Sequence, residues 1–133
     1  MNKYVFLRIN ERFKNFFRGN LESFLELYYR REENVFYKEQ FRLFLTKNSR
    51  KDISNYLVKS LGVREELNVI SNKMVLENKY KENDEILEMY DNYILLTTDN
   101  KNSPFKRYLL DYDNDFIIID LNNSKIERLS LVN

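Results

Sequence analysis

The chain has 133 residues, of which 43% are hydrophobic, 32% charged and 15% aromatic, and its net charge of +1 (22 basic, 21 acidic side chains) favours neither nucleic acid nor anionic membrane. Cys and His are absent, which excludes disulfides, Cys/His zinc sites, cysteine nucleophiles and a Ser-His-Asp triad. Two glycines and one proline exclude a glycine-rich phosphate loop, and apolar runs of at most four residues exclude a membrane-spanning segment.

The first half of the chain predicts one strand followed by helices. Aromatic and β-branched residues predict a strand over Tyr4–Ile9. Asn10 can cap a short helix that stops at Gly19, and Asn20 can cap a second helix. The second helix has one apolar face, because its apolar residues recur at helical spacing (Leu21, Phe24, Leu25 and Tyr28). Two more helices are predicted over residues 32–45 and 49–61, and the first of these has a broad shared face with Val35, Phe36, Gln40, Phe41, Phe44 and Leu45.

The second half of the chain changes to the period of strands. A short helix is predicted from Ser103 to Leu110, with turns at residues 91–92 and 122–123. The predicted strands are Val69–Tyr80, Ile86–Tyr90, Tyr93–Thr98, Asp115–Leu121 and Ile126–Val132. We therefore expect a single α+β domain over residues 1–133, in which the helical first half packs on an antiparallel-rich sheet formed by the N-terminal strand and the C-terminal half. In the strand over 115–121, Ile117 and Ile119 should share one sheet face, and Phe116 and Ile118 the other.

No pattern of residues indicates a catalytic centre. The run Asp111–Asp115 imitates the start of a calcium loop, but Phe116 replaces the required glycine and Asn122 the final glutamate. A carboxylate pair for a metal-dependent nuclease stays conceivable at Asp113 and Asp120, although an acidic turn before a buried strand is the simpler interpretation. A second acidic run, over residues 82–88, is interpreted as a solvated loop and strand edge. We expect neither an enzyme nor a cofactor or metal.

The charges are divided unevenly along the chain. Residues 1–66 carry 14 basic and 9 acidic side chains, a net of +5, whereas residues 67–133 carry 8 and 12, a net of −4. Either the surface is a mixed, solvated one, or the helical half presents a basic face to an acidic partner. The basic residues available for such a face are Arg12, Lys14, Arg18, Arg30 and Arg31.

Three phenylalanines stand in the first short helix. Phe13 and Phe17 are four residues apart and share a face, whereas Phe16 lies about 100° from Phe17. Either all three rings belong to the core, or some of them form a partner-binding patch. Aromatic rings interleaved with basic residues also suit single-stranded nucleic acid, so a small nucleic-acid-binding or phage-type regulatory domain is the alternative prediction.

Three segments share the residue pattern of one known family. Tyr4–Gly19 combines an aromatic-rich strand with an acidic-start helix and a closing glycine. Lys38–Phe44 is similar to a Lys-Gln-Ile segment, and Phe105–Leu109 with Phe116–Lys125 to a helix, a strand and an Asp-Phe-Asn-Ser-Lys turn. Together they resemble the sporulation inhibitor of replication family, SirA, over most of the chain. The family's Arg-Glu after the glycine and its terminal Gly-Trp-Leu-x-Pro do not occur here.

The resemblance implies a non-enzymatic interaction protein, and a cytoplasmic location is expected because the sequence shows neither a signal-peptide pattern nor a membrane-spanning segment. Members of the family bind the N-terminal domain of the replication initiator DnaA and restrain initiation at the chromosomal origin. Carried over by position, the partner-binding residues are Phe13, Phe17 and Gln40. If the role persists, we expect these three side chains to lie close together with their tips at least partly exposed, and we expect no contact with membrane or direct contact with nucleic acid.

Overall fold

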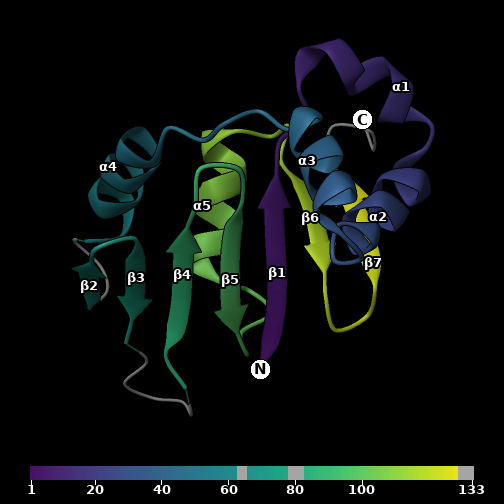
Figure 1. The fold of residues 1–133 in the computed structure, drawn as a ribbon. Helices are drawn as coiled ribbons and strands as arrows, with labels where there is room; N and C mark the ends of the chain where they lie inside the picture. Colours follow the sequence, from purple (N-terminus) through teal and green to yellow (C-terminus); the bar gives the residue numbers. More distant parts are fainter. Residues whose placement is uncertain (63–65, 78–82, 129–133) are drawn as a thin grey trace.

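The computed structural model describes residues 1–62, 66–77 and 83–128 (Figure 1). In these ranges the chain forms one antiparallel sheet of seven strands, in the order β2-β3-β4-β5-β1-β6-β7. The strands are β1 (Asn2–Leu7), β2 (Leu67–Ile70), β3 (Lys73–Leu76), β4 (Glu85–Met89), β5 (Ile94–Thr98), β6 (Ile117–Asp120) and β7 (Lys125–Arg128). The helices are the 3-10 turn η1 (Glu11–Phe13), α1 (Lys14–Arg18), α2 (Leu21–Arg30), α3 (Val35–Leu43), α4 (Arg50–Leu61) and α5 (Pro104–Tyr112).

Strand β1 is an interior strand of the sheet and is paired on both of its edges. It pairs with β5 on one side and with β6 on the other, so that Phe6 lies between Ile94 and Ile118. The first strand of the chain therefore pairs with two strands of the C-terminal half, and the expected α+β architecture with an antiparallel sheet is confirmed.

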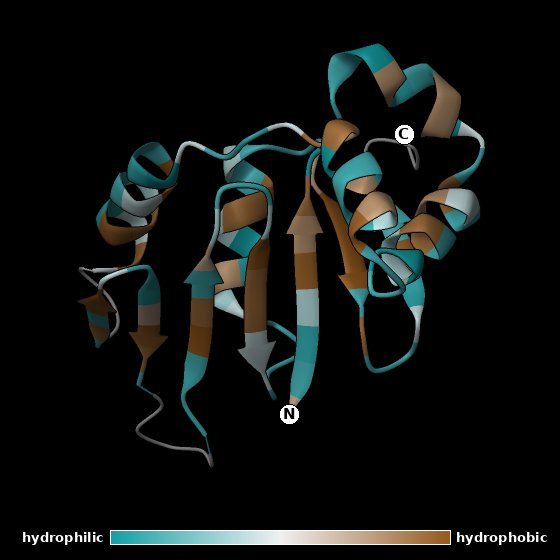
Figure 2. Ribbon diagram, viewed as in Figure 1, coloured by the Kyte–Doolittle hydropathy of each residue, from teal (hydrophilic) through white to brown (hydrophobic). Residues whose placement is uncertain are grey.

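Helices cover both faces of the sheet. Buried residues of α4 and α5, such as Ile53 and Leu109, pack in one core with Phe6, whereas buried residues of α1–α3 pack in a second core with Val5 and Leu7. Successive residues of a strand point to opposite faces, so the two cores lie on opposite sides of β1. Figure 1 shows α2 and α3 in front of β6 and β7 and α5 behind the sheet, and Figure 2 shows hydrophobic residues along β1, β5 and β6, between these layers.

Strand β6 follows the predicted alternation of its side chains. Ile117 and Ile119 pack with the α1–α3 core, and Phe116 and Ile118 pack with the α4–α5 core. All four are buried, because this part of the sheet carries helices on both faces.

Local capping explains several helix starts. The side chain of Asn10 accepts a hydrogen bond from the amide of Arg12 (3.1 Å), and Ser103 accepts one from the amide of Lys106 (3.5 Å) at the start of α5, where Pro104 is the first residue. Asn20 stands before α2 as expected, but its side chain makes no capping hydrogen bond.

Three predictions for the second half need correction. The predicted strand over Val69–Tyr80 is a hairpin of β2 and β3 that turns at Ser71, a non-glycine residue with a φ of 56°, while residues 78–82 lie outside the described ranges. The last strand begins at Lys125, and residues 129–132 of the prediction also lie outside those ranges. Glu85, expected on a solvated edge, is buried and accepts a hydrogen bond from Thr98 Oγ1 (2.9 Å), which satisfies its carboxylate.

Candidate protein-binding surface

Phe17 is a core residue and not a surface ring. Its side chain is 0% exposed, and its ring meets those of Phe16, Phe24 and Phe44 edge to face at centroid distances of 4.9, 5.1 and 5.2 Å. Helix α1 has only five residues and must bury one side against α2 and α3. The expectation that the tip of Phe17 is exposed is therefore wrong, because this ring is the one that anchors α1.

The exposed ring of α1 is its neighbour Phe16. That side chain is 64% exposed, and it points about 100° away from Phe17 around the helix. Phe13 lies between these extremes, because it is half-buried and packs its ring against Phe44 at 4.9 Å. Phe13 and Phe17 thus share the ring of Phe44, and the structure brings them together as expected, with only Phe13 partly accessible.

Helix α3 presents an apolar face to solvent. Val35, Phe36 and Leu43 are 74, 70 and 69% exposed, and Gln40 is exposed with them. Phe36, Gln40 and Leu43 follow one another at spacings of four and three residues and so lie on one side of the helix. We call these three residues the α3 outer face, while Val35, one residue before Phe36, lies about 100° from it around the helix.

The predicted shared face of α3 is therefore wrong in part. Of its six residues only Phe41 is buried, against the rings of Phe24 and Tyr28, whereas Phe44 and Leu45 are half-buried. The sequence carries a second apolar stripe, Phe36 and Leu43 at i and i+7, which could have indicated the exposed face. Phe13 and Phe17 both contact the ring of Phe44, whereas Gln40 lies one helical turn before Phe44 with its side chain exposed.

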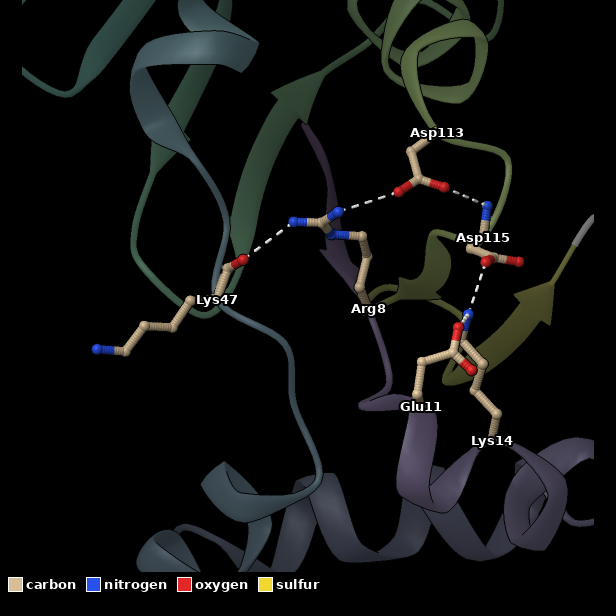
Figure 3. Close-up of polar contacts among 6 residues, drawn as sticks. All are labelled: Arg8, Glu11, Lys14, Lys47, Asp113 and Asp115. Atoms are coloured by element: carbon tan, nitrogen blue, oxygen red, sulfur yellow. Dashed lines mark hydrogen bonds and ion pairs between the residues drawn. The ribbon is translucent and has the colours of Figure 1, made fainter.

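Ion pairs tie the start of the helical layer to the end of α5 (Figure 3). Arg8 Nη1 donates to Asp113 Oδ2 (3.0 Å), and Arg8 Nη2 donates to the carbonyl oxygen of Lys47 (3.0 Å). Lys14 Nζ lies 2.8 Å from both Asp115 Oδ2 and Glu11 Oε1. The hydrogen bond to Asp115, reinforced by the one to Glu11, raises the pKa of Lys14 above its usual 10.5.

These contacts account for the acidic run before β6. Asp113 is occupied by Arg8 and also accepts the amide of Asp115, whereas Asp120 accepts the amides of the turn at residues 122–123. Asp113 precedes β6 and Asp120 ends it, so the structure does not bring the two candidate nuclease carboxylates together. Within residues 1–62, 66–77 and 83–128, no three acidic side chains are placed to hold a metal ion.

Three of the five basic residues named for a basic face are engaged by other side chains. Lys14 is held by two carboxylates, Arg31 pairs with Glu32 (2.9 Å) and stacks on the Tyr28 ring, and Arg30 lies over the ring of Tyr37. Exposed Arg12 and Arg18 flank the aromatic residues of α1. This arrangement gives an apolar helical surface with scattered charges.

None of the helices in the described ranges has the length and apolar character that crossing a bilayer requires. Comparison with known proteins adds no relative to this picture: neither a protein-family model nor a curated protein sequence matches the chain.

Proposed function

We propose that this protein is a non-enzymatic, cytoplasmic regulator of DNA replication initiation, which binds the N-terminal domain of the initiator DnaA through α1 and α3. The observation that carries the proposal is the α3 outer face, where Phe36 and Leu43 leave most of their surface in water. Exposing large apolar side chains forgoes burial worth about 1.5–3 kcal/mol each, and docking on a partner would recover this free energy.

The resemblance to the SirA family supports the choice of partner. Two of the three residues that it assigns to binding lie beside exposed apolar side chains: Phe13 in the aromatic cluster at α1, and Gln40 in the α3 outer face. Gln40 carries both a donor and an acceptor group, so it can direct hydrogen bonds to the backbone of a partner. Phe17 contributes by supporting Phe16 and Phe44 from below, without touching the partner.

Calorimetry with the isolated N-terminal domain of DnaA tests the proposal. We expect wild type to bind, and Phe36→Ala or Leu43→Ala to weaken binding by about 2 kcal/mol, about thirtyfold in Kd. Gln40→Ala should also weaken binding, by a smaller factor. Val58→Ala is the matched control, because Val58 is an exposed apolar residue of α4, whose buried residues belong to the other core.

Three outcomes would contradict the proposal in different ways. If wild type fails to bind, the partner is wrong. If the α3 variants bind as tightly as Val58→Ala, the surface is wrong. Binding of the chain to single-stranded DNA with a steep loss of affinity as salt rises would instead favour the nucleic-acid alternative, because phosphate contacts release counterions.

A further inference from the structure

The side of α3 opposite its outer face borders a pocket of about 160 Å³. Lys38 and Arg42, four residues apart on α3, line this pocket together with Phe41. Across from them lie the end of α2 and the turn between β4 and β5, which contributes Tyr90 and Tyr93. The proposed DnaA contact does not use these residues, so the pocket is a separate feature of the molecule.

The pocket has an apolar floor and an aromatic wall. Leu7, Tyr28 and Phe41 at its base are buried. Tyr90 and Tyr93 stack with their ring centroids 4.6 Å apart and their planes 20° from parallel, so the wall is already formed. An apolar group that entered would displace water from this floor, which favours binding.

The rim of the pocket is cationic. Arg31 lies over the Tyr28 ring (4.2 Å from its centroid) and donates to the Tyr28 hydroxyl (2.9 Å), which fixes its guanidinium at the edge, and its Nη1 also pairs with exposed Glu32 (2.9 Å). Lys38 has no carboxylate partner in the part of the chain that the structure describes, and Arg42 has a long contact of 3.7 Å with exposed Glu39. The one acidic side chain of the lining, Asp91, lies 3.2 Å from Arg50.

The size of the pocket limits its occupant to about one ring. A dry engineered cavity of about 150 Å³ holds benzene, and this pocket has a similar volume. We propose that it binds a small aromatic carboxylate, with the ring on the floor between Phe41 and the tyrosine wall and the carboxylate at Lys38 and its neighbouring arginines. Aromatic and cationic groups together select this class of ligand. An apolar ring alone would make no ion pair with the rim, and a small inorganic anion would bury no apolar surface of the floor.

An NMR titration of the ¹⁵N-labelled chain with sodium benzoate tests this proposal without any partner protein, so its outcome is independent of the DnaA experiment. We expect saturable shifts confined to the pocket residues, with a Kd of about 1 mM, as befits a ligand of so few atoms. Benzyl alcohol, which has the same ring and no charge, should bind about fivefold more weakly or worse.

Two exposed lysines provide matched variants. Lys38→Gln should weaken benzoate binding about fivefold to tenfold and should leave benzyl alcohol unaffected. Lys59→Gln, on α4, should change neither. Shifts that do not saturate or that scatter over the surface would overturn the proposal. So would equal affinity for the two ligands, or equal effects of the two lysine substitutions.

Discussion

Replacing Phe17 by alanine should destabilise the fold and not only its surface. The side chain is completely buried and lies in contact with three other rings, so its removal loses the transfer free energy of the ring and leaves a cavity. Phe→Ala changes at such sites cost about 3–5 kcal/mol. We expect a value near 4 kcal/mol, because the neighbouring Phe24 and Phe44 are also held by the rings of Phe41 and Phe13, respectively, and cannot easily collapse into the space.

The assay is urea unfolding followed by circular dichroism, with Phe16→Ala as the matched control. Phe16 is the same residue type one position earlier, is mostly exposed and makes one ring contact, so its truncation should cost less than about 1 kcal/mol. The slope of the unfolding free energy against urea should be the same in both variants if only stability changes. Equal costs for the two variants, or a cost below about 1 kcal/mol for Phe17→Ala, would refute the assignment of Phe17 to the core.

This result decides how binding data are interpreted. Domains of this size are stable by about 5–15 kcal/mol, so a loss of 4 kcal/mol leaves a weak protein that can appear unable to bind. A binding defect of Phe17→Ala therefore reports on contact only after correction for the folded fraction. The exposed positions Phe16, Phe36 and Leu43 do not have this ambiguity, because their side chains leave the core intact when truncated.

Three further predictions concern the sheet, the glycines and one ion pair. Ile118→Ala should cost about 2–5 kcal/mol in urea unfolding, because Ile118 is buried on β6, which pairs with β1 and β7. Gly62→Ala should lower the melting temperature, because an added Cβ would meet a carbonyl oxygen at 2.6 Å, whereas Gly19→Ala has open space and should be neutral or slightly stabilising. The pKa of Lys14 is raised in the folded protein, so the folded state binds this proton more tightly than the unfolded chain does. The resulting contribution to the free energy of unfolding is complete below pH 10.5 and is lost as the pH rises above that value. Lys14→Met should therefore lose less stability at alkaline pH than wild type.

Local patterns predict the elements that obey a single period. Residues 116–119 are four large apolar side chains in succession and form a strand with both faces covered, as that run indicates. Ser103-Pro104 likewise begins α5, because a capping hydroxyl and a proline at the first helical position require no tertiary contact to act. The hairpin of β2 and β3 escaped prediction because Ser71 adopts a positive φ, which the sequence does not signal as a glycine would.

When a helix is apolar on several sides, its own sequence does not determine which side is buried. Phe16 and Phe17 are adjacent in a helix of little more than one turn, and which ring is buried depends on where Phe24 and Phe44 lie. Helix α3 poses the same problem, with apolar residues on most of its circumference and Phe41 alone fully buried. Among the predicted site residues, Phe13 and Phe17 both contact the ring of Phe44, and this contact, distant in sequence, decides how far each ring is exposed.

Helix α3 therefore packs in the core along one side, and our proposals assign a binding function to each of the two exposed sides that flank this buried side. Phe41 fixes it through the rings of Phe24 and Tyr28, while the outer face lies on one side and Lys38 with Arg42 on the other. Substitutions on either side leave the anchor in place, so they separate the two surfaces without unfolding the helix. A single buried ring between two exposed faces is also why the apolar periodicity of this segment gave an ambiguous prediction, since only one of the three sides of the helix packs in the core.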